Sequence, residues 1–205
     1  MITVINFKTY KTGKDALKLA KTIEKFNKNI IIGVQPSHLN EIATKTKLKV
    51  YSQHVDQFKP GRRTGYIIPE AIKKDGAKGT FLNHSEHKIP FRILKKTIKV
   101  CKETKLKTIV FASNLKEAKR IQKLKPDLLI IEPPELVATK TSVSKEKPEL
   151  IINISKKLKT KFLVGAGIHT KEDVKIALKL GASGVALSSA ITKSKNPKKV
   201  LKDLF

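Results

Sequence analysis

The sequence predicts an α/β fold in which eight parallel strands, each followed by a helix, close into a (β/α)8 barrel. Short apolar runs alternate along the chain with lysine-rich segments of helical periodicity. The runs do not alternate between apolar and polar residues, which is typical of strands buried on both faces. No Pro/Gly/Ser-rich linker interrupts the series, so residues 1–205 are expected to form a single domain.

Eight runs rich in Val, Ile, Leu and Phe are the expected strands. They occupy residues 2–7, 30–35, 49–55, 79–84, 107–113, 128–134, 161–167 and 184–190. A doubly wound open sheet is the alternative arrangement, and it would be expected to carry a G-x-G-x-x-G fingerprint after the first strand. The sequence NFKTYKTGKD at that place lacks this pattern, which favours the closed barrel. Such barrels usually have about 250 residues, so this chain would be a compact example.

Helical periodicity is clear between the runs. Residues 16–26 and 91–101 each place their apolar side chains on one helical face. Cys101 lies on the apolar stripe of the second segment, so we interpret it as a core residue. It is the only cysteine, which excludes an internal disulfide and favours a reducing, cytoplasmic setting.

Capping signals predict two further helices. Segment 170–180 begins with Thr170 and has Asp173 three residues later, which resembles a capping box. It ends at Gly181, where a left-handed residue is favoured. Segment 114–124 begins with asparagine and stops before a proline.

The chain is strongly basic, with a formal net charge of +27. Such a field attracts anions. Nucleic-acid binding is nevertheless expected to be non-specific at most, because the lysines are spread over almost every predicted helix. Arginine and aromatic residues, which read and stack on bases, are scarce: only four residues are arginine and 5% are aromatic.

Membrane association is not expected. No apolar run approaches the roughly 18 residues that a spanning helix needs. The first ten residues, MITVINFKTY, have no basic leader and no small-residue cleavage site. We therefore interpret them as a first strand and not as a signal peptide.

Polar residues follow several of the expected strands, and in such barrels the active site lies at the C-terminal strand ends. The residues at these ends include Asn6, Lys8, Gln53, Asn83, His84, Glu86, Glu132, Glu135, Gly165, Ala166, Gly167, Ser188 and Ser189. A lysine, a histidine and a carboxylate therefore converge on one face. The small residues after the last two strands lie where many barrels bind phosphate.

Metal and paired-carboxylate sites are the competing interpretations of these residues. His84 and His87 are three residues apart, but no further ligand cluster accompanies them, so no metal or other cofactor is expected. Glu132 and Glu135 flank a Pro-Pro segment, where two carboxylates do not reliably face one ligand. We therefore expect one functional glutamate.

The motifs at these strand ends resemble those of the triosephosphate isomerase family, most of all its short archaeal form. They are NFKTY (6–10), QHVDQFKPGRRTG (53–65), LNHSE (82–86), EPPEL (132–136), GAGI (165–168) and GVALSSAITK (184–193). They occur in order and cover essentially the whole chain. The resemblance implies a TIM barrel that interconverts dihydroxyacetone phosphate and glyceraldehyde 3-phosphate through an enediol(ate).

The resemblance also implies roles for the polar residues. Glu132 matches the base, and His84 matches a neutral imidazole whose pKa is held down by a helix N-terminus, for which this family is a standard example. Lys8 matches the cation that balances the negative charge of substrate and enediolate, with Asn6 placing it. Glu86 matches a carboxylate close to that lysine.

By the same resemblance, backbone N–H groups hold the substrate phosphate. They would come from the lid at roughly 133–140, including Ala138, and from Gly165, Ala166, Gly167, Ser188 and Ser189. The chain departs from the family pattern at residues 138–140, where ATK replaces the usual GTG. It departs again at 188–189, where two serines stand in place of the Gly-Gly of many members and the small pair of archaeal ones.

Residues 57–66 resemble the loop through which family members dimerise, with Thr64 near a partner's active site. A homodimer or homotetramer is therefore expected. Two other functions stay open from the residues alone. A sugar-phosphate epimerase would need metal-binding histidines and aspartates at its strand ends, and a nucleic-acid-binding barrel would leave Lys8, His84 and Glu132 unexplained.

Overall fold

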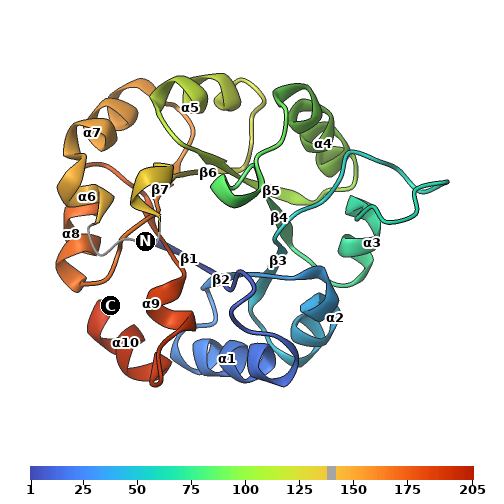
Figure 1. Cartoon of the computed structure of the whole chain (residues 1–205), viewed down its shortest axis with the longest axis horizontal. Helices are drawn as coiled ribbons and strands as arrows, with labels where there is room; N and C mark the ends of the chain where they lie inside the picture. Colours follow the sequence, from blue (N-terminus) through green and yellow to red (C-terminus); the bar gives the residue numbers. More distant parts are fainter. Residues whose placement is uncertain (138–141) are drawn as a thin grey trace.

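A computed structural model describes residues 1–137 and 142–205. Eight parallel strands form a closed barrel in which each pairs with the next and β8 pairs with β1 (Figure 1). The strands are β1 (Ile2–Asn6), β2 (Ile31–Val34), β3 (Lys49–Ser52), β4 (Gly79–Leu82), β5 (Lys107–Ala112), β6 (Leu128–Ile131), β7 (Phe162–Val164) and β8 (Gly184–Leu187). The predicted fold class is confirmed.

Helices surround the barrel in the described part of the chain (Figure 1). The α-helices are α1 (Gly13–Phe26), α2 (Pro36–Lys45), α3 (Pro69–Lys74), α4 (Phe91–Glu103), α5 (Leu115–Gln122), α6 (Val143–Glu146), α7 (Pro148–Lys157), α8 (Lys171–Lys179), α9 (Ser189–Thr192) and α10 (Pro197–Leu204). Two 3-10 helices, η1 (Ser85–His87) and η2 (Pro134–Leu136), follow β4 and β6. The number exceeds the expected eight because β6 and β8 are each followed by two α-helices.

Each strand is shorter than its apolar run, mostly at the C-terminal end. The run 128–134 gives only β6, because Pro133 and Pro134 have no N–H with which to continue the ladder. Likewise, only the first part of the run 184–190 forms a strand: β8 ends at Leu187, and α9 begins two residues later. The residues of each run that follow the strand's C-terminal end belong to the loops on the face where the polar side chains gather.

The core has two layers. One cluster fills the inside of the barrel, where Phe81 and Phe111 pack edge to face at 5.7 Å between ring centroids. The other lies between the strands and the helices. Glycines make room for two of the rings inside: a Cβ on Gly33 would lie 1.9 Å from the Phe81 ring, and one on Gly79 would lie 2.1 Å from the Tyr51 ring. The barrel is therefore filled by side chains and is not a pore.

The predicted helix signals are confirmed at both ends of α8. The Thr170 hydroxyl accepts a hydrogen bond from the Asp173 N–H at 3.2 Å, and the Asp173 carboxylate accepts from the Thr170 N–H at 2.8 Å. Gly181 takes φ +101° after the helix. Cys101 is fully buried in the core as predicted, and burial raises the pKa of its thiol to about 12.

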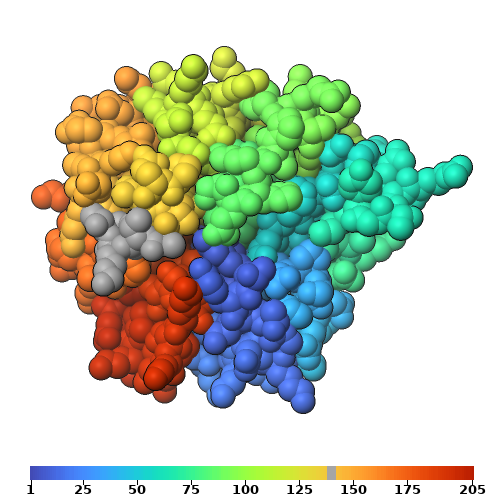
Figure 2. Space-filling model, viewed as in Figure 1, coloured from blue at the N-terminus to red at the C-terminus, as the bar shows by residue number. Residues whose placement is uncertain are grey.

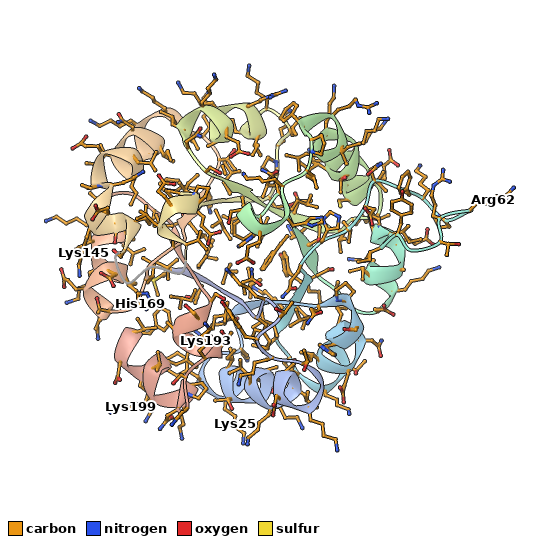
Figure 3. All side chains as sticks on the ribbon, viewed as in Figure 1. Lys25, Arg62, Lys145, His169, Lys193 and Lys199 are labelled. Carbon is orange, nitrogen blue, oxygen red and sulfur yellow. The ribbon has the colours of Figure 1, made fainter. Side chains whose placement is uncertain are left out.

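The loop 57–66 projects from the barrel between β3 and α3, with Arg62 at its tip (Figures 1 and 3). Asp56 fixes its base, because its carboxylate accepts from the Ile67 N–H at 2.8 Å. Farther out, the Phe58 and Tyr66 rings meet edge to face at 4.5 Å. No helix in the described residues is long and apolar enough to cross a membrane.

Candidate active site

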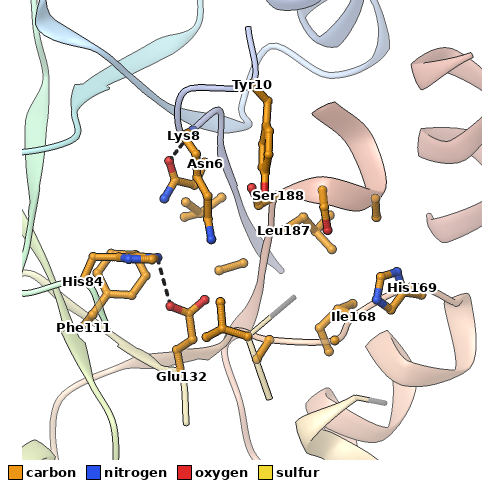
Figure 4. Close-up of a pocket in the computed structure, with 17 residues that line it drawn as sticks. Asn6, Lys8, Tyr10, His84, Phe111, Glu132, Ile168, His169, Leu187 and Ser188 are labelled. Atoms are coloured by element: carbon orange, nitrogen blue, oxygen red, sulfur yellow. Dashed lines mark hydrogen bonds and ion pairs between the residues drawn. The ribbon is translucent and has the colours of Figure 1, made fainter. Parts of the chain in front are cut away.

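The polar strand ends meet in a pocket at the middle of one face of the barrel. In Figure 2 the end of β1 (blue), the segment after β4 (green) and the segment after β6 (yellow) adjoin at this point. Eight predicted site residues line the pocket, namely Asn6, Lys8, His84, Glu132, Ala166, Gly167, Ser188 and Ser189. Figure 4 shows Lys8, His84 and Glu132 directed into the same space.

Lys8 owes its place to an unusual backbone turn directly after β1. Its φ is +47°, a left-handed conformation that is uncommon outside glycine. The Asn6 carboxamide oxygen accepts from the Lys8 N–H at 2.9 Å, and the Gln53 amide donates to the Lys8 carbonyl at 2.9 Å. These bonds hold the turn, and the Lys8 ammonium lies 2.6 Å from the Glu86 carboxylate.

His84 lies two residues after the end of β4 and is buried. The backbone N–H of Glu86 donates to His84 Nδ1 at 3.1 Å. Nδ1 is therefore an acceptor, and the ring hydrogen of the neutral imidazole is on Nε2. The Phe111 ring meets the imidazole edge to face at 4.6 Å. The local structure thus presents a neutral histidine with its N–H directed toward the pocket.

Glu132 begins the loop after β6, and its side chain is 11% exposed. Its Oε2 atom lies 3.0 Å from His84 Nε2, as the dashed line in Figure 4 marks. The contact does not have hydrogen-bond geometry, and this buried oxygen has no hydrogen bond among the described residues. A buried carboxylate oxygen without a donor is costly to maintain, and such groups are frequent at functional sites. Glu135, by contrast, is exposed and pairs with Lys147.

The loops after β7 and β8 form the opposite wall. Ala166 and Gly167 both take left-handed backbone conformations, with φ +74° and +65°. The Ser188 hydroxyl is buried in this wall and has no hydrogen-bond partner among the described residues. Small side chains here leave backbone groups accessible from the pocket.

Three described residues among those predicted for the site, Glu86, Gly165 and Thr64, do not line the pocket. Gly165 does not line the pocket but lies beneath Glu132, since a Cβ on it would be 3.1 Å from Glu132 Oε1. Thr64 is exposed on the projecting loop and is not among the residues that line the pocket. Ala138, with the central part of the predicted lid, lies outside the described residues.

The structure adds pocket residues that the sequence reasoning missed. Tyr10, Phe111 and His169 line the pocket (Figure 4). Tyr10 belongs to the NFKTY motif, which was a usable signal, whereas Phe111 is indistinguishable in sequence from other apolar strand residues. His87 packs against the ring of His54 at 4.5 Å. The described residues contain no group of three or more His, Cys, Asp or Glu that could hold a metal ion.

A closed parallel barrel with a lysine, a histidine and a glutamate at its C-terminal strand ends has the architecture of a barrel enzyme. The comparisons with known proteins identify which one. A family model described as triosephosphate isomerase matches residues 1–204, and the chain therefore belongs to the triosephosphate isomerase family.

Curated relatives support the same assignment. The triosephosphate isomerase of Methanocaldococcus jannaschii is 41% identical and is covered over 99% of its length by all of this chain. That of Sulfurisphaera tokodaii is 40% identical, with 100% of this chain and 93% of the relative covered. Neither relative is named as an epimerase or as a nucleic-acid-binding protein, and the resemblance to the archaeal form is confirmed.

The fold has a matching solved structure. The crystal structure of triosephosphate isomerase from Bartonella henselae superposes with a TM-score of 0.76 at 17% identity. The match covers 99% of this chain and 98% of that one. At this identity the likeness supports the fold alone.

Proposed function

We propose that this chain interconverts dihydroxyacetone phosphate and D-glyceraldehyde 3-phosphate by proton transfer through an enediol(ate), a step of glycolysis and gluconeogenesis. The observation that carries the proposal is the 3.0 Å approach of His84 Nε2 to Glu132 Oε2 in the pocket of a family member. A hydrogen-bond donor and a proton acceptor this close can act on adjacent atoms of one small substrate.

Glu132 is the proposed base. Its carboxylate takes the proton from one substrate carbon and returns it to the neighbouring carbon, so that the enediol(ate) forms and collapses without net loss of a proton. A carboxylate suits this step because closing the site over the substrate removes water from around it. The proposed acceptor of this proton is Oε2, which has no hydrogen bond among the described residues and lies 3.0 Å from His84 Nε2.

His84 and Lys8 are proposed to stabilise the charge that develops on the substrate oxygens. The Nε2–H of a neutral imidazole donates a hydrogen bond to the carbonyl oxygen, and the acceptor role of Nδ1 supports this tautomer. The ammonium of Lys8, whose side chain is 11% exposed, supplies the positive charge. Glu86 and Asn6 are proposed to position Lys8.

The phosphate is proposed to lie against the loops after β7 and β8. Backbone N–H groups at Gly167, Ser188 and Ser189 are the proposed donors, with Ala166 shaping the wall. Ala138 is proposed to contribute another N–H from the lid. Gly165 is proposed to act indirectly, by leaving space for Glu132. The chemistry of the proposed reaction needs no metal or organic cofactor.

We also propose that the single-domain chain works in the cytoplasm as a homodimer or homotetramer. The projecting loop supports self-association, because its Phe58–Tyr66 pair and the Arg63 guanidinium 4.7 Å above the Phe58 ring give it a defined shape. Thr64, on the same loop, would then reach a partner's pocket. Nucleic acid is not proposed as a specific partner.

The test is a coupled assay of glyceraldehyde 3-phosphate isomerisation that compares the native chain with Glu132→Gln and Glu41→Gln. We expect activity in the native chain and a fall in kcat of roughly 10²–10⁴ for Glu132→Gln. Glu41→Gln is the matched control, because this carboxylate pairs with Lys45 on the surface of α2, does not line the pocket and should keep native activity. An inactive native chain, or equal losses in both variants, would contradict the proposal.

A further inference from the structure

Glu117, in the first turn of α5, accepts four hydrogen bonds outside its own helix backbone. Its Oε1 atom accepts from Asn83 Nδ2 at 2.8 Å and from Lys88 Nζ at 2.9 Å. Its Oε2 atom accepts from the Ser113 N–H at 2.7 Å and from the same ammonium at 3.0 Å. Burial would raise the pKa of this carboxyl, but these donors outweigh burial and lower it. The residue is therefore a fixed anion on the side of the barrel next to β4.

Two of these partners delimit the segment that carries the proposed electrophile. Asn83 directly precedes His84, and Lys88 directly follows η1. The two residues are 34 and 29 positions away from Glu117 in sequence, yet one carboxylate binds both. Residues 84–87, which include His84 and Glu86, therefore lie between Asn83 and Lys88, two residues that both bind Glu117.

Asn83 is itself strained and fully engaged. Its φ of +61° is left-handed, and a conformation of this kind persists only where the surroundings hold it. Its amide also donates to the Phe111 carbonyl at 3.0 Å, and its oxygen accepts from the Ile89 N–H at 3.3 Å. Phe111 is the residue whose ring packs on the His84 imidazole. A movement of Asn83 would thus reach His84 through the chain and through this ring.

We propose that Glu117 is a positioning residue for the isomerase reaction, which holds Asn83 and Lys88 and thereby sets the orientation of the His84 imidazole. Glu117 does not line the pocket, so it acts only through these two residues. The inference rests on the proposed function for its kinetic consequence. Its structural part, the orientation of His84, does not depend on the reaction.

The expected kinetic effect follows from what His84 would do. A misplaced imidazole N–H weakens stabilisation of the developing oxyanion, whereas the phosphate end of the pocket is unaffected. A displacement of about 1 Å at a reacting group can cost roughly 10²-fold in rate. We expect kcat of Glu117→Ala to fall by roughly ten- to a hundred-fold, with KM changed by less than about threefold.

The control is another carboxylate of the same kind at the opposite end of the barrel. Asp127, just before β6, accepts from the Thr108 N–H at 2.8 Å and binds Lys107 Nζ at 3.1 Å. Asp127→Ala therefore removes a similar set of bonds without touching residues 83–88. It should lower stability but keep native kcat.

The experiment measures kcat, KM and the ¹⁵N signals of the His84 ring in the native chain, Glu117→Ala, Lys88→Met and Asp127→Ala. We expect shifted or broadened His84 ring signals with lower kcat in Glu117→Ala, a smaller change of the same kind in Lys88→Met, and neither in Asp127→Ala. Native His84 signals and kcat in both Glu117→Ala and Lys88→Met would overturn the proposal. If Glu117→Ala does not fold, Lys88→Met alone decides by the same two readouts.

The two proposals fail in different ways. A native chain without isomerase activity would contradict the proposed function, while the His84 signals would still report whether Glu117 orients the ring. If the native chain is active and the His84 ring signals are the same in the native chain, Glu117→Ala and Lys88→Met, only the positioning role is contradicted.

Discussion

Replacing Asp173, which lies beside the proposed phosphate wall, by asparagine should lower the stability of the folded chain by an amount that depends on pH. The Asp173 carboxylate accepts from the N–H groups of His169 and Thr170 at 3.0 and 2.8 Å. Lys145 Nζ lies 2.8 Å from the other oxygen, and the side chain is 4% exposed. Asp173→Asn keeps one oxygen acceptor but removes the charge.

The pKa of Asp173 sets the magnitude. Burial would raise this pKa, but the Lys145 ammonium and the His169 and Thr170 donors lower it from 3.8 to about 2. At about 1.36 kcal/mol per pKa unit, the charged carboxylate stabilises the folded chain by about 2 kcal/mol at neutral pH. Because the folded-state pKa is the lower one, this contribution is complete above the unfolded-state value and is lost as pH falls through the folded-state value.

The assay is urea unfolding of the native chain and Asp173→Asn at several values of pH, monitored by circular dichroism. We expect Asp173→Asn to be less stable by about 2 kcal/mol at pH 7, and the difference to shrink to about half near pH 3. Glu172→Gln, an exposed carboxylate in the same helical turn, is the control and should change little. A difference between native and Asp173→Asn that is independent of pH would refute the reasoning.

Three further variants or treatments test the packing. Gly33→Ala should destabilise the chain by about 1–3 kcal/mol or more in urea unfolding, because its Cβ would overlap the Phe81 ring; a stability equal to native would show that the barrel interior can yield. Gly165→Ala should lower kcat roughly tenfold with little change in stability, because its Cβ pushes Glu132 Oε1 by a few tenths of an ångström; unchanged kcat would show that the carboxylate position is not limiting. Cys101 should react with a thiol reagent at pH 8 only after unfolding, because it is buried and its pKa is about 12; rapid reaction of the folded chain would contradict its place in the core.

Local patterns in the sequence predicted the strands and the ends of several helices well. Strands appeared as apolar runs because both of their faces are buried, and α8 was marked by Thr170 and Asp173, whose reciprocal bonds lie within one turn. The convergence of Lys8, His84 and Glu132 followed from parallel topology alone, since all C-terminal strand ends of a barrel share one face.

The sequence could not predict contacts that depend on tertiary packing. In the sequence, Glu117 looks like the third residue of a helix whose N-cap is Asn114. The capping bond is present, since the Glu117 N–H donates to the Asn114 side-chain oxygen at 2.9 Å. The hydrogen bond of Glu117 to Asn83 joins residues 34 positions apart and depends on how α5 packs against β5, the strand that pairs with β4. Phe111 likewise has no local mark that separates it from other strand residues. Such features follow from distances between elements, which no short pattern encodes.

The central claim is that this pocket moves a proton between two carbons of a triose phosphate. The most direct test is to convert glyceraldehyde 3-phosphate in D2O with the native chain and follow the product by proton NMR. The account predicts that at least part of the product carries deuterium at the carbon that gains the hydrogen, because the proton held by Glu132 can exchange with solvent before it is returned. It also predicts that Glu132→Gln lowers the rate of conversion by roughly 10²–10⁴. Conversion by Glu132→Gln at the native rate would contradict a base at Glu132, and no conversion by the native chain would contradict the proposed function.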